Sequence, residues 1–355
     1  MKPRLRHVAE LAGVSQATVS RVLNGRPEVA ETTRREVLLA LQQLGYEPPG
    51  LGRARRRGLV GLIVPELDNP SFPRFAQAIE SRLAAEGLTA VLCTSTPAGM
   101  GEADYLDVLL DHAVSGIMFV SGVHADAEAD HHRYQELAAR KLPVVLVNGR
   151  PPDLSLPAVT TDHVAAARQG VAHLASLGHT RIGLALGPVR YVPSHDLLEG
   201  HRQGCERAGI VVDEDLIAET LYGIEGGHAV GARLAGAGAT GIICGSDLIA
   251  MGVLRALHES GRHVPGDVSV IGFDDAGPNA YVHPPLTSVQ QPYEAISAAA
   301  VQLLTDRISD PDAPDTELRF RPELIVRAST GPAPIVDDAG DTETSDEGAA
   351  APDPV

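Results

Sequence analysis

Residues 8–24 of this 355-residue chain read VAELAGVSQATVSRVLN. The small residues Ala12 and Gly13 let two helices pack closely at a turn. Val14 and Val19 can fill the junction between those helices, and the second helix opens on polar residues. The stretch therefore predicts a helix-turn-helix.

The polar opening of the second helix points to DNA. Ser15 is suited to cap this helix, because its hydroxyl can accept a hydrogen bond from a backbone N–H of the first turn. In a major groove, Gln16 can pair with adenine edges and Arg21 with guanine edges. A plain three-helix bundle with a polar face is the alternative, and the basic charge of this segment disfavours it.

Helix signals continue on both sides of this stretch. Val8 and Leu11 share one face of the helix before the turn, and Gly13 ends that helix. A further helix is expected over residues 31–44, where Val37 and Leu38 belong to a set of apolar residues at helical spacing. The head is therefore expected to be all-α.

Net charge divides the chain into a basic head and an acidic body. Residues 1–58 hold 11 lysines and arginines against 5 acids, a balance of +6. The rest of the chain carries −23, which gives a net charge of −17 for the whole. Only the head is expected to meet DNA phosphate. We place a helix-turn-helix domain at residues 1–46 and a basic hinge linker at residues 47–58.

Beyond residue 58 the pattern changes to short β-rich runs that alternate with amphipathic helices, which is typical of parallel sheets covered on both faces. Strands are expected at residues 59–64, 89–94, 116–121, 144–148, 182–186, 241–245 and 268–273. Helices are expected at residues 73–86, 102–113, 163–177, 194–208, 226–237 and 247–260. A body of this length needs two α/β lobes, with a cleft at the carboxyl ends of their strands.

Other features of the chain indicate no further chemistry. No apolar run is long enough to span a bilayer and no apolar signal core follows the basic N-terminus, so a cytoplasmic protein without membrane contact is expected. Cys93, Cys205 and Cys244 are interpreted as buried free thiols. The histidines and acids of residues 124–132 are interpreted as a solvated loop, so no metal site or cofactor is predicted. The acidic tail, residues 332–355, is expected to be disordered.

The chain resembles the LacI/GalR family of bacterial repressors over about residues 4–330. The head matches that family's signature over residues 7–46, almost throughout. In the body, the resemblance rests on residues 61–65, 69–72, 173–182, 246–247, 267–275 and 284–289. It implies a homodimer on a pseudo-palindromic operator, and a periplasmic-binding-protein-like sensor that the chain crosses between lobes three times. Lobe one is expected at about residues 59–161 and 291–320, and lobe two at about residues 162–290 and 321–331.

The resemblance also implies roles for residues of the head. Base-reading positions are Gln16, Ala17 and Arg21. Phosphate-contact positions, which orient the helix without reading sequence, are Ser15, Thr18, Asn24 and Thr33.

The linker departs from the family. Arg55 stands where the family has a leucine that wedges open the operator's central step, and Pro49 replaces the usual asparagine. Either Leu51 takes over the wedge in a shifted register, or arginines such as Arg53 and Arg55 insert into the minor groove without a wedge.

The resemblance implies a sugar-like effector in the cleft. Its predicted contacts are Asn69, Phe72, Asn148, Arg150, Tyr222, Ser246, Asp274 and Gln291. Carboxylate and amide groups in this set can bond hydroxyls, and its aromatic rings can stack on a sugar ring. Taken singly, Phe72 is also compatible with lobe core and Asp274 with a strand-end acid. Leu197 stands where the family often has an arginine, so one ligand clamp is altered.

Within the family the chain looks most like the maltose-type repressors of actinobacteria, over residues 69–73, 110–116, 221–227 and 321–327. A regulator for another sugar or a nucleoside, and an effector that strengthens DNA binding, remain alternatives. An enzyme is disfavoured because the body has no phosphate-binding glycine loop or nucleophile elbow. A dimer is expected instead of a tetramer because no leucine-rich heptad closes the chain.

Overall fold

The computed structural model describes residues 5–23, 29–44, 58–95 and 99–334. Two compact units divide the chain, one containing residues 1–58 and the other most of the remainder, and each is described by itself. The predictions for Asn24, Leu51, Arg53 and Arg55, and for most of the tail, lie outside the described residues.

The described part of the head consists of α1 (Leu5–Leu11), α2 (Gln16–Leu23) and α3 (Glu31–Leu44). Their shared core includes Val8, Val19 and Val37. Gly13 has a φ of 64°, a left-handed conformation that suits the turn between α1 and α2. The Ser15 hydroxyl accepts a hydrogen bond from the Thr18 amide at 3.1 Å, which caps α2 as predicted.

Two leucines of the head are more exposed than their helical spacing suggested. Leu11 is 50% exposed and Leu38 is 53% exposed. In α3 the buried positions are Val37 and Ala40, whose spacing of three residues places them on one face. The apolar pattern therefore predicted the helix correctly but not which of its apolar residues are buried.

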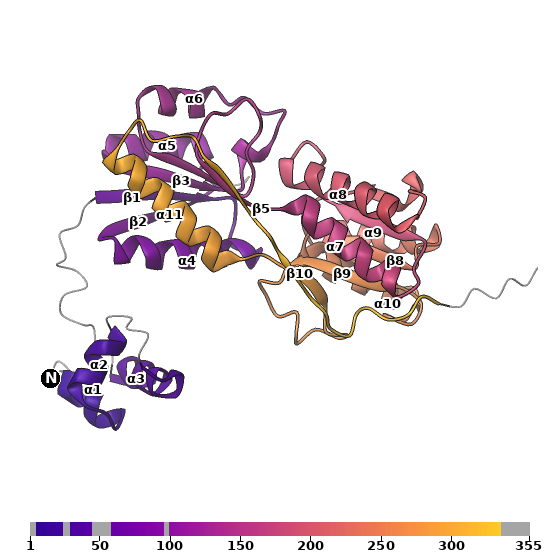
Figure 1. Ribbon diagram of the computed structural model, residues 1–355, viewed down its shortest axis with the longest axis horizontal. Coiled ribbons are helices and arrows are strands. Elements are labelled where there is room, and N and C mark those ends of the chain that lie inside the picture. The colour runs from indigo at the N-terminus through magenta and orange to yellow at the C-terminus, as the bar shows by residue number, and fades with distance from the viewer. Residues whose placement is uncertain (1–4, 24–28, 45–57, 96–98, 335–355) are drawn as a thin grey trace, which may run out of the picture. The chain divides into compact units, whose positions relative to one another are not determined.

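The first sheet of the body has the strand order β11-β5-β4-β3-β1-β2. Its strands are β1 (Gly58–Val64), β2 (Leu88–Thr94), β3 (Gly116–Val120), β4 (Val144–Val147), β5 (Ala158–Thr161) and β11 (Glu317–Phe320). The pairings β1–β3, β3–β4, β4–β5 and β5–β11 are parallel. Its helices are α4 (Ser71–Ala85), α5 (Glu102–Asp111), α6 (His132–Ala139) and α11 (Tyr293–Ser309), and α4 packs beside α11 on one face (Figure 1).

The second sheet has the strand order β12-β10-β9-β8-β6-β7. Among its described residues the pairing of β10 with β12 is antiparallel, and the other pairings are parallel. Its strands are β6 (Ile182–Leu186), β7 (Ile217–Glu219), β8 (Gly241–Cys244), β9 (Ser269–Asp274), β10 (Thr287–Gln290) and β12 (Glu323–Ile325). Helices α7 (His163–Ser176) and α8 (Val192–Ala208) pack together, as do α9 (Ile224–Gly236) and α10 (Asp247–Glu259). Single 3₁₀ turns lie at Val123–Ala125 and Glu214–Leu216.

The chain passes between the two lobes three times. It leaves the first sheet after β5, returns after β10 to form α11, and crosses again between β11 and β12. Five strands were not expected from the sequence: β5, β7, β10, β11 and β12. These strands are only three or four residues long, and runs this short carry little periodic signal.

The interpretation of the histidine-rich segment as a solvated loop was wrong in part. His124 is fully buried, and His131 is 4% exposed with Nδ1 3.0 Å from Asp153 Oδ2. Helix α6 begins at His132, inside the predicted loop. No group of three metal-binding side chains occurs in the described part of the chain. The prediction that Cys93, Cys205 and Cys244 are buried thiols is confirmed.

Candidate functional site

Helix α2 separates buried from exposed side chains sharply. Val19 and Val22 face the head core, whereas Gln16, Ala17 and Arg21 are exposed. Thr18 is half-buried, and its Oγ1 lies 2.9 Å from the Oγ of Ser15, the residue that caps α2. Thr33, on α3, is also half-buried. The predicted base-reading side chains thus share the exposed face of one helix, which is the geometry that major-groove reading requires.

A cavity of about 290 Å³ lies between the two lobes at the carboxyl ends of their strands. Six of the eight residues predicted for the cleft line it: Asn69, Phe72, Asn148, Tyr222, Ser246 and Asp274. Parallel strands of both sheets end here, which is why side chains separated by two hundred positions meet.

Asp274 is a buried acid that lines this cavity. Its side chain is buried, and its Oδ1 accepts hydrogen bonds from Gln291 Nε2 at 2.6 Å and, at the limit of 3.5 Å, from Ser71 Oγ. No described side chain donates to Oδ2, so this oxygen can receive a ligand hydroxyl. Burial, together with the nearby Asp247 carboxylate, raises the pKa of Asp274 well above its usual range.

Asn148 offers a second acceptor. Its Nδ2 donates to Ser121 Oγ at 2.6 Å, while its Oδ1 is buried without a hydrogen-bond partner among the described residues. A buried unpaired acceptor costs about 1–3 kcal/mol, and a donor on a bound ligand would remove that cost. Asn148, Ser121 and Asp274 all have positive φ, at 68°, 42° and 111°. Such strained backbone is concentrated at functional sites in proteins.

Aromatic rings form much of the remaining wall. The rings of Tyr191 and Tyr222 lie 6.4 Å apart in an edge-on arrangement, and Phe72 comes from the opposite lobe. The Tyr222 ring packs on Gly187, where any Cβ atom would come within 2.0 Å of it. His163 stacks on Phe273, and burial lowers the pKa of His163 to about 4, so this ring is neutral at pH 7.

Two predicted contacts do not line the cavity. Arg150 instead donates to Glu317 Oε2 at 2.9 Å and to the Leu154 carbonyl, which ties β11 to the loop after β4. Gln291 lies behind Asp274, where it also accepts a hydrogen bond from Thr161 at 2.7 Å. It can therefore orient the carboxylate without facing a ligand. Leu197, at the position of the altered clamp, is buried and lines the cavity.

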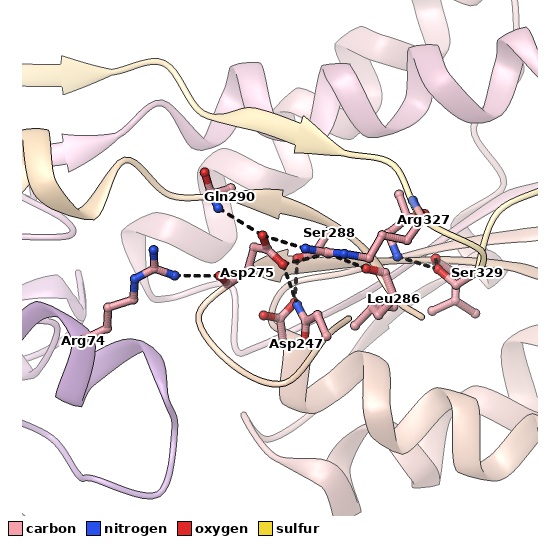
Figure 2. A network of polar contacts seen from close by, with 11 residues as sticks. Arg74, Asp247, Asp275, Leu286, Ser288, Gln290, Arg327 and Ser329 are labelled. Carbon is pink, nitrogen blue, oxygen red and sulfur yellow. Dashed lines mark hydrogen bonds and ion pairs between the residues drawn. The ribbon is translucent and has the colours of Figure 1, made fainter. Parts of the chain in front are cut away.

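A polar network supports the loop that follows Asp274 (Figure 2). Asp275 pairs with Arg327 at 2.8 Å and accepts from Gln290 at 3.0 Å. From the other lobe, Arg74 of α4 donates to the Asp275 carbonyl at 2.8 Å. Next to this network, Asp247 accepts from Ser288 at 2.6 Å, and burial raises the pKa of Asp247 to about 6. Side chains from three segments of the chain thus bind Asp275, the residue directly after Asp274.

Some lining residues were not predicted from sequence. They include Glu66, Ser71, Ser121, His163, Arg190 and Tyr191. Ser121 directly follows β3 and Glu66 lies two residues after β1, so the rule that binding groups lie at strand carboxyl ends could have indicated them. The other lining residues lie at or just before the start of a helix. Whether they reach the cavity depends on the direction of that helix, which the sequence does not show.

No helix among the described residues is long and apolar enough to cross a membrane. Comparisons with known proteins identify families for both parts of the chain. Residues 4–49 match the family described as bacterial regulatory proteins, lacI family, and residues 171–330 match a periplasmic binding protein-like domain.

Individual relatives are similar over nearly the whole chain. The HTH-type transcriptional regulator MalR of Streptomyces coelicolor is 48% identical, over 94% of this chain and 98% of its own length. The complex of the transcriptional regulator CelR with cellobiose is 31% identical, with a TM-score of 0.70 over 92% of this chain and 99% of that one. The lac repressor dimer bound to operator is 26% identical, with a TM-score of 0.68 over 93% and 100%.

Proposed function

The chain belongs to the lacI family of bacterial regulatory proteins, and we propose that it represses carbohydrate-utilisation genes until maltose or a maltodextrin occupies its cavity. As a member of this family it is a transcription regulator that binds operator DNA as a dimer, responds to a sugar-type effector, and is not an enzyme. The identity of the sugar is the proposal.

The observation that carries the proposal is a pair of polar groups in a cavity lined by aromatic rings. Asn148 Oδ1 is a buried acceptor without a partner among the described residues, and the Asp274 carboxyl can bond a further group, so the hydroxyls of a polyol suit both. The Phe72 and Tyr222 rings can cover the apolar face of a pyranose. Similarity to MalR favours maltose-type sugars over others with the same hydroxyl pattern.

Regulation follows from the position of the cavity between two lobes. A ligand that bonds both lobes stabilises the arrangement in which they are closed, and it shifts DNA affinity only by the difference between its affinities for the two states. On this proposal Gln16, Ala17 and Arg21 read bases while Ser15, Thr18, Asn24 and Thr33 hold phosphate. Such a protein works in the compartment that holds the chromosome.

The test is a titration of operator affinity against maltose, maltotriose, longer maltodextrins, cellobiose, ribose and a nucleoside. We expect a maltodextrin to weaken operator binding by about 1–3 kcal/mol, the usual size of an allosteric coupling. A response to cellobiose or the nucleoside alone would reject the maltose assignment, but the chain would still be an effector-controlled transcription regulator. A sugar that tightens operator binding would identify a corepressor.

A further inference from the structure

An ion pair joins the two lobes beside the cavity. Arg190 lies in the loop after β6, and its Nε is 2.7 Å from Asp126 Oδ2, in the loop after β3. The Asp126 side chain is only 15% exposed, and Arg190 lines the cavity whereas Asp126 does not. One lobe therefore contributes the cation of the cavity wall, and the other contributes the anion that neutralises it.

Backbone contacts hold this ion pair in register. The Ala127 amide donates to the Arg190 carbonyl at 2.8 Å, and Asp126 forms an antiparallel bridge with Tyr191. The other carboxylate oxygen, Asp126 Oδ1, accepts from the Glu128 amide at 3.1 Å. The Arg190 guanidinium also lies over the Tyr191 ring, 5.0 Å from its centroid. Because both side chains are already positioned, pairing costs them little further entropy.

The remaining charges of the cavity are negative or absent. Among the described residues Arg190 is the only arginine or lysine that lines it, and the lining acids are Glu66 and Asp274. His163 is neutral at pH 7 because burial lowers its pKa to about 4. A bound anion would thus face two acids and one arginine that is already paired.

At three of the helix starts around the cavity, a backbone amide is already bonded to a local cap. Backbone N–H groups at a helix start can bind anions when they are free. Here the Ser71 amide donates to Asn69 Oδ1 at 3.0 Å, and the Ile249 amide donates to Ser246 Oγ at 3.2 Å. The Ala165 amide, at the start of α7, donates to Asp162 Oδ1 at 2.8 Å. These three donors are consumed by local caps.

We propose that Asp126 is a specificity-determining residue that neutralises Arg190 and thereby restricts the cavity to uncharged sugars, excluding their phosphate esters. This inference rests on the proposed function of the cavity as a sugar site. Asp126 acts through Arg190 and not by touching the ligand, so it is a positioning residue. Replacing its charge frees the one cation that could bind phosphate.

The test compares neutral and phosphorylated ligands on the full chain by calorimetry, using maltose with maltose 1-phosphate and glucose with glucose 6-phosphate. Inorganic phosphate serves as a third probe. The measured quantity is the ratio of the two affinities within each pair, because a general loss of folding or binding changes both alike. Asp130→Asn is the matched control: it removes one exposed acid from the same segment, and no described arginine pairs with Asp130.

In the natural chain we expect the phosphate esters to bind at least 100-fold more weakly than the neutral sugars. Asp126→Asn should narrow that gap by about tenfold, as a charge-assisted hydrogen bond to phosphate becomes available. The gained affinity should fall as salt is added. Adding Arg190→Gln to Asp126→Asn should remove the gain, and Asp130→Asn should leave the ratio unchanged.

Several outcomes would overturn the inference. If the natural chain binds a phosphate ester as tightly as the neutral sugar, the charge restriction is wrong while the sugar site stands. An unchanged ratio of neutral-sugar to phosphate-ester affinity in Asp126→Asn would show that Asp126 does not prevent Arg190 from binding phosphate. If none of these ligands, charged or neutral, binds and alters operator affinity, the proposed function and this inference both fall.

Discussion

Helix α2 and the cavity between the lobes are built by the chain in opposite ways. Helix α2 places the predicted base-reading side chains within eight consecutive residues, and it packs on a small core that includes Val8, Val19 and Val37. The cavity collects side chains from Pro65 to Asp274, most of them near the ends of strands and the starts of helices in both lobes. Substitutions on the exposed face of α2 should therefore have independent, additive effects on binding. Substitutions in the cavity should have effects that depend on neighbouring side chains.

Removal of the Asp274 carboxylate gives the largest effect that we predict. Asp274→Ala should lower sugar affinity by at least 100-fold, because the ligand loses its buried acceptor and Gln291 loses its partner. Operator binding without sugar should persist. Calorimetry measures the sugar affinity and fluorescence anisotropy the operator affinity.

Gln291→Ala is the companion that tests coupling within the cavity. It should weaken sugar binding less than Asp274→Ala, and the double variant should be no weaker than Asp274→Ala alone. Additive losses in the double variant would contradict the view that Gln291 acts by orienting Asp274.

Arg21→Ala is the corresponding change in the head. It should cost about 1–3 kcal/mol on the cognate operator and relax the choice of one base pair in each half-site. Thr18→Ala should instead weaken binding to all DNA sequences alike. Equal losses on cognate and scrambled DNA in Arg21→Ala would reject its base-reading role, and both variants should keep the natural sugar affinity.

The buried acid beside the cavity predicts a pH-dependent cost in stability. Burial raises the pKa of Asp247 to about 6, so the folded chain holds this proton more tightly than the unfolded chain does. The contribution of Asp247 to stability is then highest below pH 4 and is lost as pH rises to about 6. Asp247→Asn should therefore be more stable than the natural chain by on the order of 1–2 kcal/mol at pH 7.5.

That difference should shrink toward pH 4, and urea unfolding at several pH values measures it. Asp130→Asn, which removes an exposed acid, should show no such pH-dependent gain. A natural chain that is as stable as Asp247→Asn at pH 7.5 would show that Ser288 and the start of α10 fully stabilise the ionised carboxylate.

The smallest predicted effect concerns the linker, which lies outside the described residues. If arginines neutralise phosphate there, Arg55→Leu should flatten the slope of log affinity against log salt by about 0.9 for each phosphate that is no longer neutralised. It should also increase operator bending, since it restores a wedge leucine. An unchanged slope, with bending abolished in Leu51→Ala, would favour the leucine in a shifted register instead.

Residue patterns alone were enough to predict the head and the general location of the cavity. Local spacing predicted α2, its Ser15 cap and its polar face, because a helix-turn-helix is specified by contacts a few residues apart. Alternation of strands and helices predicted two α/β lobes, and parallel topology alone places binding groups at strand ends. Resemblance then supplied Asn69, Phe72, Asn148, Tyr222, Ser246 and Asp274, all of which line the cavity.

Which polar groups are free to bind a ligand became visible only in the folded chain. Arg150 and Gln291 were predicted as ligand contacts. In the structure Arg150 instead donates to Glu317, and Gln291 donates to Asp274. Arg190 lines the cavity but is paired with Asp126, which lies in the other lobe. A side chain's availability depends on the partners that a fold brings within hydrogen-bond distance, and partners separated by 17 to 167 positions leave no periodic signal in a sequence.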